Sequence, residues 1–184
     1  MGYYVNLEYS SVILKNENLK EILTRWKNLN SPEHDDIKYG GTYQGGKKIK
    51  SHYSWLPEDY DKEVNSVQDM LDLLGFSFEE VEQGIKIIGY NRKMGQEDVF
   101  FNAIADMIDS NQVMRWSGED GDIFAWTFQG KTLNALNEME YDKVIVREEI
   151  KKYNVSEIEA KKEVKENLNE SVLDAKKNSL RKLL

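Results

Sequence analysis

Strand-like and helix-like periodicities alternate along the first 131 residues of this 184-residue chain, and this order restricts the folds that it can adopt. Alternating apolar side chains are typical of half-buried strands, whereas apolar residues spaced by three and four indicate amphipathic helices. Strand patterns cover residues 2–9, 52–55, 84–90, 112–116 and 123–128, and helical patterns cover residues 19–29, 64–74 and 97–108. Single helices between strands predict an α+β fold: a mainly antiparallel sheet with helices packed on one face, in a ferredoxin-like or related sandwich.

Between the first helical pattern and the second, residues 32–50 contain four glycines and alternate little. Such a segment is either a loop or an irregular hairpin. Gly75 directly follows the second helical pattern, where a glycine commonly ends a helix.

The pattern changes after the last predicted strand, so we expect an α+β domain over residues 1–131 and a helical extension over residues 132–184. Residues 144–153 have a helical pattern, and Ser156 with Glu159 forms the capping box that opens a further helix. The narrow apolar stripe of that helix suits docking on the body of the protein or pairing with a second copy as a homodimer.

The composition excludes several kinds of chemistry. The chain has no cysteine and only two histidines, which excludes disulfides, cysteine-bound zinc, thiol catalysis and a multi-histidine metal centre. We therefore expect no metal and no other cofactor. No apolar run approaches the roughly 20 residues of a membrane span, and the first residues lack the pattern of a signal peptide. These features predict a soluble, cytoplasmic protein without a membrane partner.

Charge is unevenly distributed along the chain. Residues 1–140 contain 14 basic and 24 acidic residues, so this part is strongly acidic. An acidic surface repels a phosphate backbone, which disfavours direct binding of nucleic acid, and it attracts proteins with a basic surface. The same charge also serves simple solubility.

Two short runs concentrate the carboxylates. One follows Pro57, and the other lies in the glycine-rich turn at residues 118–122, between the last two predicted strands. Neither has the spacing of a calcium loop, so a solvated surface or a contact with a basic partner is expected. The candidate partner-binding residues are Glu58, Asp59, Asp61 and Glu63 in the first run and Glu119, Asp120 and Asp122 in the second.

Residues 41–47 match the spacing G-x-x-x-x-G-K of phosphate-binding loops. The match is incomplete, because Lys48 replaces the Ser or Thr that binds magnesium and neither a strand before nor a helix after the segment is evident. A basic loop without a ligand and a nucleotide site built from charge and stacking both remain open. The residues of that alternative site are Tyr43, Lys47, Lys48, Lys50 and Tyr53, with Tyr39 beside them.

Phe124, Trp126 and Phe128 lie on one face of the strand predicted over residues 123–128. This face either packs beneath the helices or forms an open interface. We expect packing, because the helices need a sheet face to cover.

Several motifs resemble those of a known group of proteins. They are Tyr53-Ser54-Trp55, Gly95-Gln96-Glu97-Asp98, the run from Trp116 to Gly121 and the run from Trp126 to Lys131. Together they are similar to small, mostly uncharacterised proteins encoded by phages, prophages and bacteria, over roughly residues 50–131. This group has no agreed activity, so the resemblance implies no catalytic residue. It implies manipulation of host machinery, including inhibition of CRISPR or other defence systems.

These observations give one leading expectation about function and two alternatives. The leading one is a non-enzymatic phage or mobile-element protein that binds and inhibits a host nucleic-acid-handling defence complex through its acidic surface. The first alternative is an anti-defence protein that sequesters a nucleotide signal. The second is a carboxylate-based hydrolase, which is disfavoured because no motif combines a nucleophile, a base and an orienting group.

Overall fold

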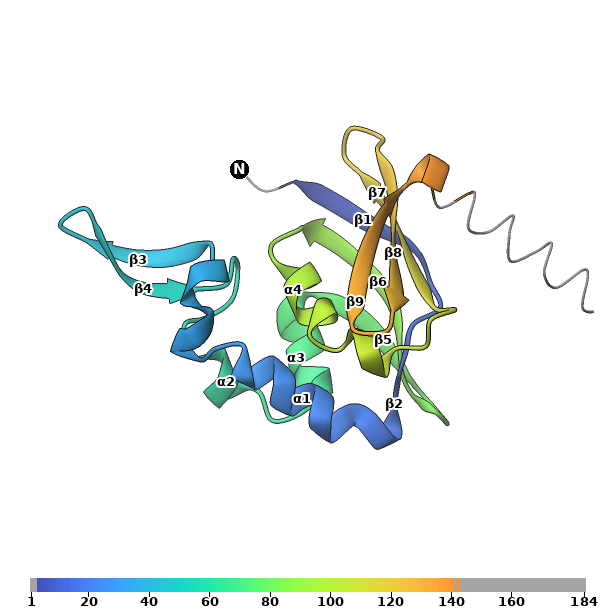
Figure 1. The fold of residues 1–184 in the computed structure, drawn as a ribbon, viewed down its shortest axis with the longest axis horizontal. Coiled ribbons are helices and arrows are strands. Elements are labelled where there is room, and N and C mark those ends of the chain that lie inside the picture. The colour runs from blue at the N-terminus through green and yellow to red at the C-terminus, as the bar shows by residue number, and fades with distance from the viewer. Residues whose placement is uncertain (1–2, 141, 143–184) are drawn as a thin grey trace, which may run out of the picture. The chain divides into compact units, whose positions relative to one another are not determined.

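The structure, a computed structural model, describes residues 3–140 and 142, and the chain divides into two compact units, residues 1–138 and 139–184. The elements below belong to the first unit (Figure 1). Its strands are β1 (Tyr4–Ser10), β2 (Ile13–Lys15), β3 (Gly40–Gln44), β4 (Lys47–His52), β5 (Phe76–Val81), β6 (Gly84–Lys93), β7 (Val113–Gly118), β8 (Ile123–Gln129) and β9 (Thr132–Asn137). Its α-helices are α1 (Leu19–Asn28), α2 (Tyr60–Glu63), α3 (Val67–Leu74) and α4 (Glu97–Asn102), and 3-10 turns occupy Asn16–Asn18, Pro32–Ile37 and Ala105–Met107.

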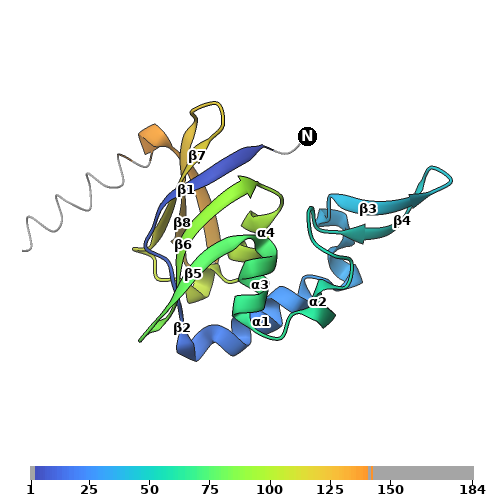
Figure 2. The same ribbon diagram turned by 180° about the vertical axis from the view of Figure 1, so that it is seen from behind.

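Seven strands form one sheet in which every pairing is antiparallel. Both β1 and β2 pair with β6, so they act as one strand interrupted at residues 11–12, and the sheet order is β5-β6-β1-β7-β8-β9. The helices α1 and α3 connect β1 to β5, α4 connects β6 to β7, and all three lie on one face of the sheet (Figure 2). This is the β-α-β-β-α-β arrangement of a ferredoxin-like fold, widened by β8 and β9, and it confirms the expected fold class.

Local sequence signals set both ends of α3. Ser66 and Asp69 form a capping box at the start of α3, and Gly75 ends this helix in the left-handed conformation with φ 91°. Any side chain at Gly75 would also collide with the guanidinium of Arg92. Arg92 is exposed and its flexible side chain can move aside, so it is the left-handed conformation that requires glycine here.

An aromatic cluster fills the space between the sheet and the helices. Phe101 lies at its centre, with ring centroids 6.1 Å from Trp26, 5.1 Å from Phe76 and 5.9 Å from Trp126. The Trp26 indole also donates a hydrogen bond of 2.7 Å to the carbonyl of Phe100, which satisfies its one polar group inside the core. The aromatic face of β8 is thus packed against the helices, as expected.

Two predicted elements end earlier than expected, and one alternative left open by the sequence is resolved. The strand expected over residues 52–55 ends at His52, because the chain turns at residues 54–56. The helix expected over residues 97–108 ends at Asn102 and is followed by a separate 3-10 turn. Residues 32–50 contain a hairpin, which is the second of the two forms expected there.

Three strands of the sheet were not predicted: the short β2, β5 and β9. β5 begins directly after Gly75 and forms an edge of the sheet, where two of its residues are exposed glutamates that weaken the apolar alternation. β9 lies where the helical extension was expected to begin at residue 132. Leu133 and Leu136 have the spacing of a helix, but in β9 they pair with Phe128 and Ala125 and so point to opposite faces of the sheet. The α+β part therefore continues past residue 131, and the helices expected from residue 144 onward lie outside the described residues.

Phe101→Ala should test the aromatic cluster. Removal of this ring leaves a cavity among three other aromatic side chains, so the free energy of unfolding should fall by about 3–5 kcal/mol in urea denaturation. Phe78→Ala, on the edge strand where the ring is only half-buried, should cost clearly less. Equal losses in the two variants would contradict a core centred on Phe101.

Candidate functional site

The hairpin β3–β4 and its two flanking segments extend away from the sheet as an arm, residues 37–55 (Figures 1 and 2). Gly45 and Gly46 form its turn with φ values of 59° and 78°, which suits the two-residue turns that match the twist of a hairpin. Ile49 has no partner across the hairpin, because Thr42 pairs with Lys50 and Tyr43 with Lys48. The arm therefore carries a β-bulge in its middle.

A single buried side chain holds both ends of the arm. The Gln96 carbonyl oxygen accepts hydrogen bonds from the backbone N–H of Tyr39 at 2.9 Å and of Ser54 at 3.2 Å. Its amide nitrogen donates to the carbonyl of Ile37 at 2.5 Å. These bonds bring the two strands of the arm together at their base and join them to the loop before α4.

Lys38 strengthens the same base from the other side. Its side chain is buried, and its ammonium donates to the carbonyls of Asn30 and Ser31 and to the carboxylate of Asp35, at 2.8–3.1 Å. A buried ammonium with three acceptors has its hydrogen-bonding capacity filled, which makes its burial tolerable. Lys38 is thus a structural residue of the base of the arm.

One predicted acidic residue contacts the arm itself. The Glu58 carboxylate accepts hydrogen bonds from Lys50 Nζ at 2.6 Å and from the Thr42 hydroxyl at 2.5 Å. The bond from Lys50 lowers the pKa of Glu58, and the same carboxylate raises the pKa of Lys50. Glu58 and Lys50 therefore position the arm against α2, and neither charge is free.

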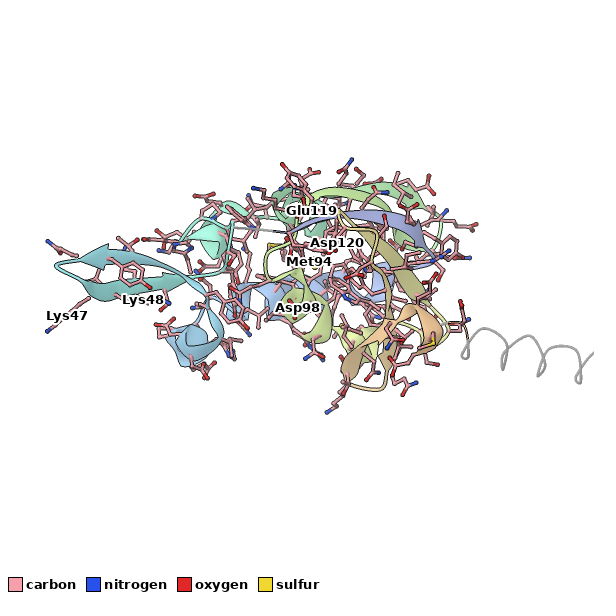
Figure 3. All side chains as sticks on the ribbon, turned by 90° about the horizontal axis from the view of Figure 1, so that it is seen from above. Lys47, Lys48, Met94, Asp98, Glu119 and Asp120 are labelled. Carbon is pink, nitrogen blue, oxygen red and sulfur yellow. The ribbon has the colours of Figure 1, made fainter. Side chains whose placement is uncertain are left out.

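Most of the other exposed side chains of the arm are aromatic, aliphatic or basic. Of the nine large apolar side chains that are exposed among the described residues, five belong to the arm. They are Ile37, Tyr39, Tyr43, Ile49 and Trp55. Lys47 lies at the free end of the arm, with Lys48 behind it (Figure 3). Tyr43, Lys47 and Lys48, predicted from the sequence as ligand contacts, are thus brought together on this surface.

Tyr53 does not belong to that surface. Its ring is fully buried against Tyr60 and Phe100, and its hydroxyl donates to the carbonyl of Leu29 at 3.2 Å. Burial raises the pKa of Tyr53 to about 12. The structure therefore places Tyr53, predicted as a ligand contact, in the core and not on the surface of the arm, because the chain turns inward directly after β4.

The second acidic run lies in the turn between β7 and β8. The Tyr3 hydroxyl donates a hydrogen bond to the Asp120 carboxylate, which lowers the pKa of Asp120 and raises that of Tyr3 to about 12. The backbone N–H of Glu119 donates to the carbonyl of Tyr4 at 3.0 Å. Glu119 and Asp120 lie near Met94 in Figure 3, and the Met94 N–H bonds to the Tyr3 carbonyl at 2.9 Å. The turn is thus fixed to the end of β1.

The two acidic runs do not form one surface. The first run lies in and just before α2, and α2 and the β7–β8 turn are at different ends of the unit (Figures 1 and 2). In the first run, Asp59 pairs with Lys62 at 3.0 Å and Asp61 accepts a hydrogen bond from Asn30. Among the described residues, only three of the seven predicted carboxylates make no hydrogen bond or salt bridge through the side chain: those of Glu63, Glu119 and Asp122.

Gln96 and Glu97 were not predicted as site residues, although both belong to a motif singled out in the sequence. Glu97 is buried, and its carboxylate accepts hydrogen bonds from the Tyr90 hydroxyl at 2.8 Å and from the Gly95 N–H at 2.6 Å. Burial raises the pKa of Glu97. Since Gln96 also binds Ser54, two of the four motifs meet in space at the base of the arm.

Comparisons of the chain with known protein families, with curated proteins and with solved structures found no match. The resemblance to phage and prophage proteins stays a prediction from the motifs. No helix in the described part of the chain combines the length and apolar character needed to cross a bilayer.

Gln96→Leu should release the arm without unfolding the sheet. The change leaves two backbone N–H groups and one carbonyl without their partner, at about 1–3 kcal/mol for each group that stays buried. Hydrogen exchange should accelerate in peptides from residues 37–55 and stay slow in β6 and β7. Gln68→Leu, at the surface of α3, is the control. Unchanged exchange in the arm would show that Gln96 does not hold it.

Glu97→Gln should stabilise the protein at neutral pH. Because the folded-state pKa of Glu97 is raised, the folded state retains its proton where the unfolded state has lost it, so stability falls as pH rises above the unfolded pKa. Glutamine keeps an acceptor for Gly95 without this loss. The gain, measured by urea denaturation, should be present at pH 7 and should shrink toward pH 4. A gain that does not depend on pH would contradict the assignment.

Proposed function

We propose that the protein is a non-enzymatic binding protein that inhibits a host nucleic-acid-handling defence complex, and that the β7–β8 turn contacts a basic surface of that complex. The observation that carries this proposal is the pair of carboxylates on Glu119 and Asp122, which have no internal partner and stand on a fixed turn. The sequence motifs shared with phage and prophage proteins support the host as target. Such a target places the protein in the host cytoplasm.

Backbone hydrogen bonds within the β7–β8 turn hold it in one conformation before any partner binds. The Gly118 N–H donates to the carbonyl of Asp122 at 2.7 Å, and the Gly121 N–H donates to the carbonyl of Gly118 at 3.0 Å. Gly121 has φ 89°, a conformation that favours glycine. Asp120 accepts the hydrogen bond from Tyr3, so it orients the turn and leaves contact with the partner to its two neighbours. A rigid turn loses little conformational entropy on binding, and more of the interaction energy then appears as affinity.

The charge of the whole chain acts in the same direction. A net charge of −8 attracts a basic partner at long range and raises the rate of encounter, while the turn supplies the short-range contact. Glu63 is the member of the first acidic run best suited to a second contact, because Glu58, Asp59 and Asp61 bind Lys50, Lys62 and Asn30. The turn is therefore the first place to test.

The double variant Glu119→Lys/Asp122→Lys should lose the partner. The native chain, immobilised and exposed to host lysate, should retain a basic nucleic-acid-binding complex that elutes as salt is raised and that mass spectrometry identifies. The turn variant should retain at least about tenfold less, roughly 1.4 kcal/mol of binding free energy. Added native protein should also inhibit the activity of the purified complex.

The control for this experiment is Glu17→Lys/Glu82→Lys, which changes the net charge equally at two exposed positions away from the turn. This control should retain the complex nearly as well as the native chain does. If the turn variant and the control lose the complex equally, only the net charge matters and the turn is not the contact. If the turn variant retains the complex fully, the proposal fails.

A further inference from the structure

The arm has a charge opposite to that of the protein that carries it. Residues 37–55 contain four lysines and neither aspartate nor glutamate, although the chain as a whole has 33 acidic and 25 basic residues. The arm also holds most of the exposed large apolar side chains of the described residues. We propose that the arm binds single-stranded nucleic acid, with bases stacked on Tyr39 and Tyr43 and phosphates contacted by Lys47 and Lys48. This site is separate from the β7–β8 turn and adds a second ligand to the proposed function.

The aromatic and basic groups of the arm are neighbours. Tyr43 and Lys48 are directly opposite each other in the hairpin, so their side chains share one face. The Lys48 stem lies over Gly41, where any side chain would collide with it, and its ammonium donates to the carbonyl of Lys38 at 2.9 Å. Tyr39 is 78% exposed and Tyr43 is 64% exposed, which leaves both rings available for stacking. Aromatic rings beside cations are the usual surface for single-stranded nucleic acid.

The tip of the arm is far enough from the acidic body that the body's charge repels a phosphate chain there only weakly. β4 has six residues and is therefore about 20 Å long, whereas charges are screened over about 8 Å at physiological salt. Lys47 lies at the free end of this strand (Figure 3). Near the body, Glu58 neutralises Lys50, and the Lys48 ammonium reaches back along the hairpin to the Lys38 carbonyl, so Lys47 is the lysine at the tip. A phosphate chain can therefore approach the tip although the body repels it.

The form of the surface favours a polymer over a single nucleotide or an acidic protein. A mononucleotide usually binds in a concave pocket that covers most of its surface, whereas these side chains spread along an extended hairpin. An acidic peptide would bring carboxylates against the negative faces of the tyrosine rings, which stacking bases do not do. Every base has a flat face, so this kind of binding tolerates many sequences.

The test measures the fluorescence anisotropy of a labelled 20-nucleotide oligothymidylate titrated with the full chain at 50 and 200 mM salt. We expect binding that weakens as salt rises. Tyr39→Ala/Tyr43→Ala should weaken it by about tenfold or more. Lys47→Gln/Lys48→Gln should reduce the slope of log affinity against log salt by about 1.4, since each contacted phosphate of a single strand contributes about 0.7.

The matched control is Tyr4→Ala/Tyr9→Ala, which removes two exposed tyrosines from the sheet and should leave the affinity unchanged. All substituted side chains are exposed, and circular dichroism checks that each variant is folded. Absence of binding at 50 mM salt, equal loss in the two tyrosine pairs, or equal binding of polyglutamate would overturn the proposal. Binding of thymidine monophosphate as tightly as the oligonucleotide would also overturn it, in favour of a nucleotide site.

The turn variant Glu119→Lys/Asp122→Lys separates this proposal from the proposed function. It should bind the oligonucleotide at least as well as the native chain, because it removes negative charge and leaves the arm intact. If the host complex is not captured but the oligonucleotide binds, the proposed contact of the β7–β8 turn is overturned and the proposal for the arm is supported. If the complex is captured through the turn but no oligonucleotide binds, only the arm proposal fails.

Discussion

The hydrogen bonds made by Gln96 and Glu97, two consecutive buried residues at the start of α4, connect the parts of this structure. Glu97 binds Tyr90 in β6, Gln96 binds both ends of the arm, and the same helix carries Phe101 into the aromatic core. A buried amide is well suited to this position, because it offers one acceptor and two donors to backbone groups that would otherwise lack partners. Sheet, core and arm therefore meet at one short segment, in which Gln96 binds the arm, Glu97 binds the sheet and Phe101 packs in the core.

The sequence predicted the framework because the framework obeys local rules. Apolar spacing located α1 and α3, Gly75 ended α3, and alternating residues located β1, β6, β7 and β8. β5 and β9 were not predicted, because edge strands bury one face only in part and their apolar alternation is therefore weak. Pairing with the neighbouring strand decides their structure instead. The role of Gln96 could not be predicted either, because its hydrogen-bond partners lie 42 to 59 residues away in the sequence. Its place in a motif was the only available signal.

Acidic residues selected by composition turn out to have different tasks. Glu58 fixes the arm, Asp59 and Asp61 have partners close to α2, and Asp120 orients its own turn through Tyr3. A run of carboxylates in a sequence cannot distinguish these tasks, since each depends on a donor brought close by the fold. Only the carboxylates of Glu63, Glu119 and Asp122, among the seven candidates in the described residues, are left without such a donor, and this difference is a property of the tertiary structure alone.

The arm is an insertion in the connection between β1 and β5, which explains how a basic, aromatic surface coexists with an acidic body. The cost of closing a loop grows slowly with its length, so a ferredoxin-like fold tolerates a long insertion in one of its crossovers. An isolated two-stranded hairpin is barely stable by itself, and here the Gln96 amide and the Glu58 carboxylate supply the missing contacts at its base. Since these contacts involve backbone groups, one threonine and one lysine, the outward-facing residues of the arm are free to change without disturbing the core. The fold thereby separates the residues that maintain the structure from those exposed on the arm.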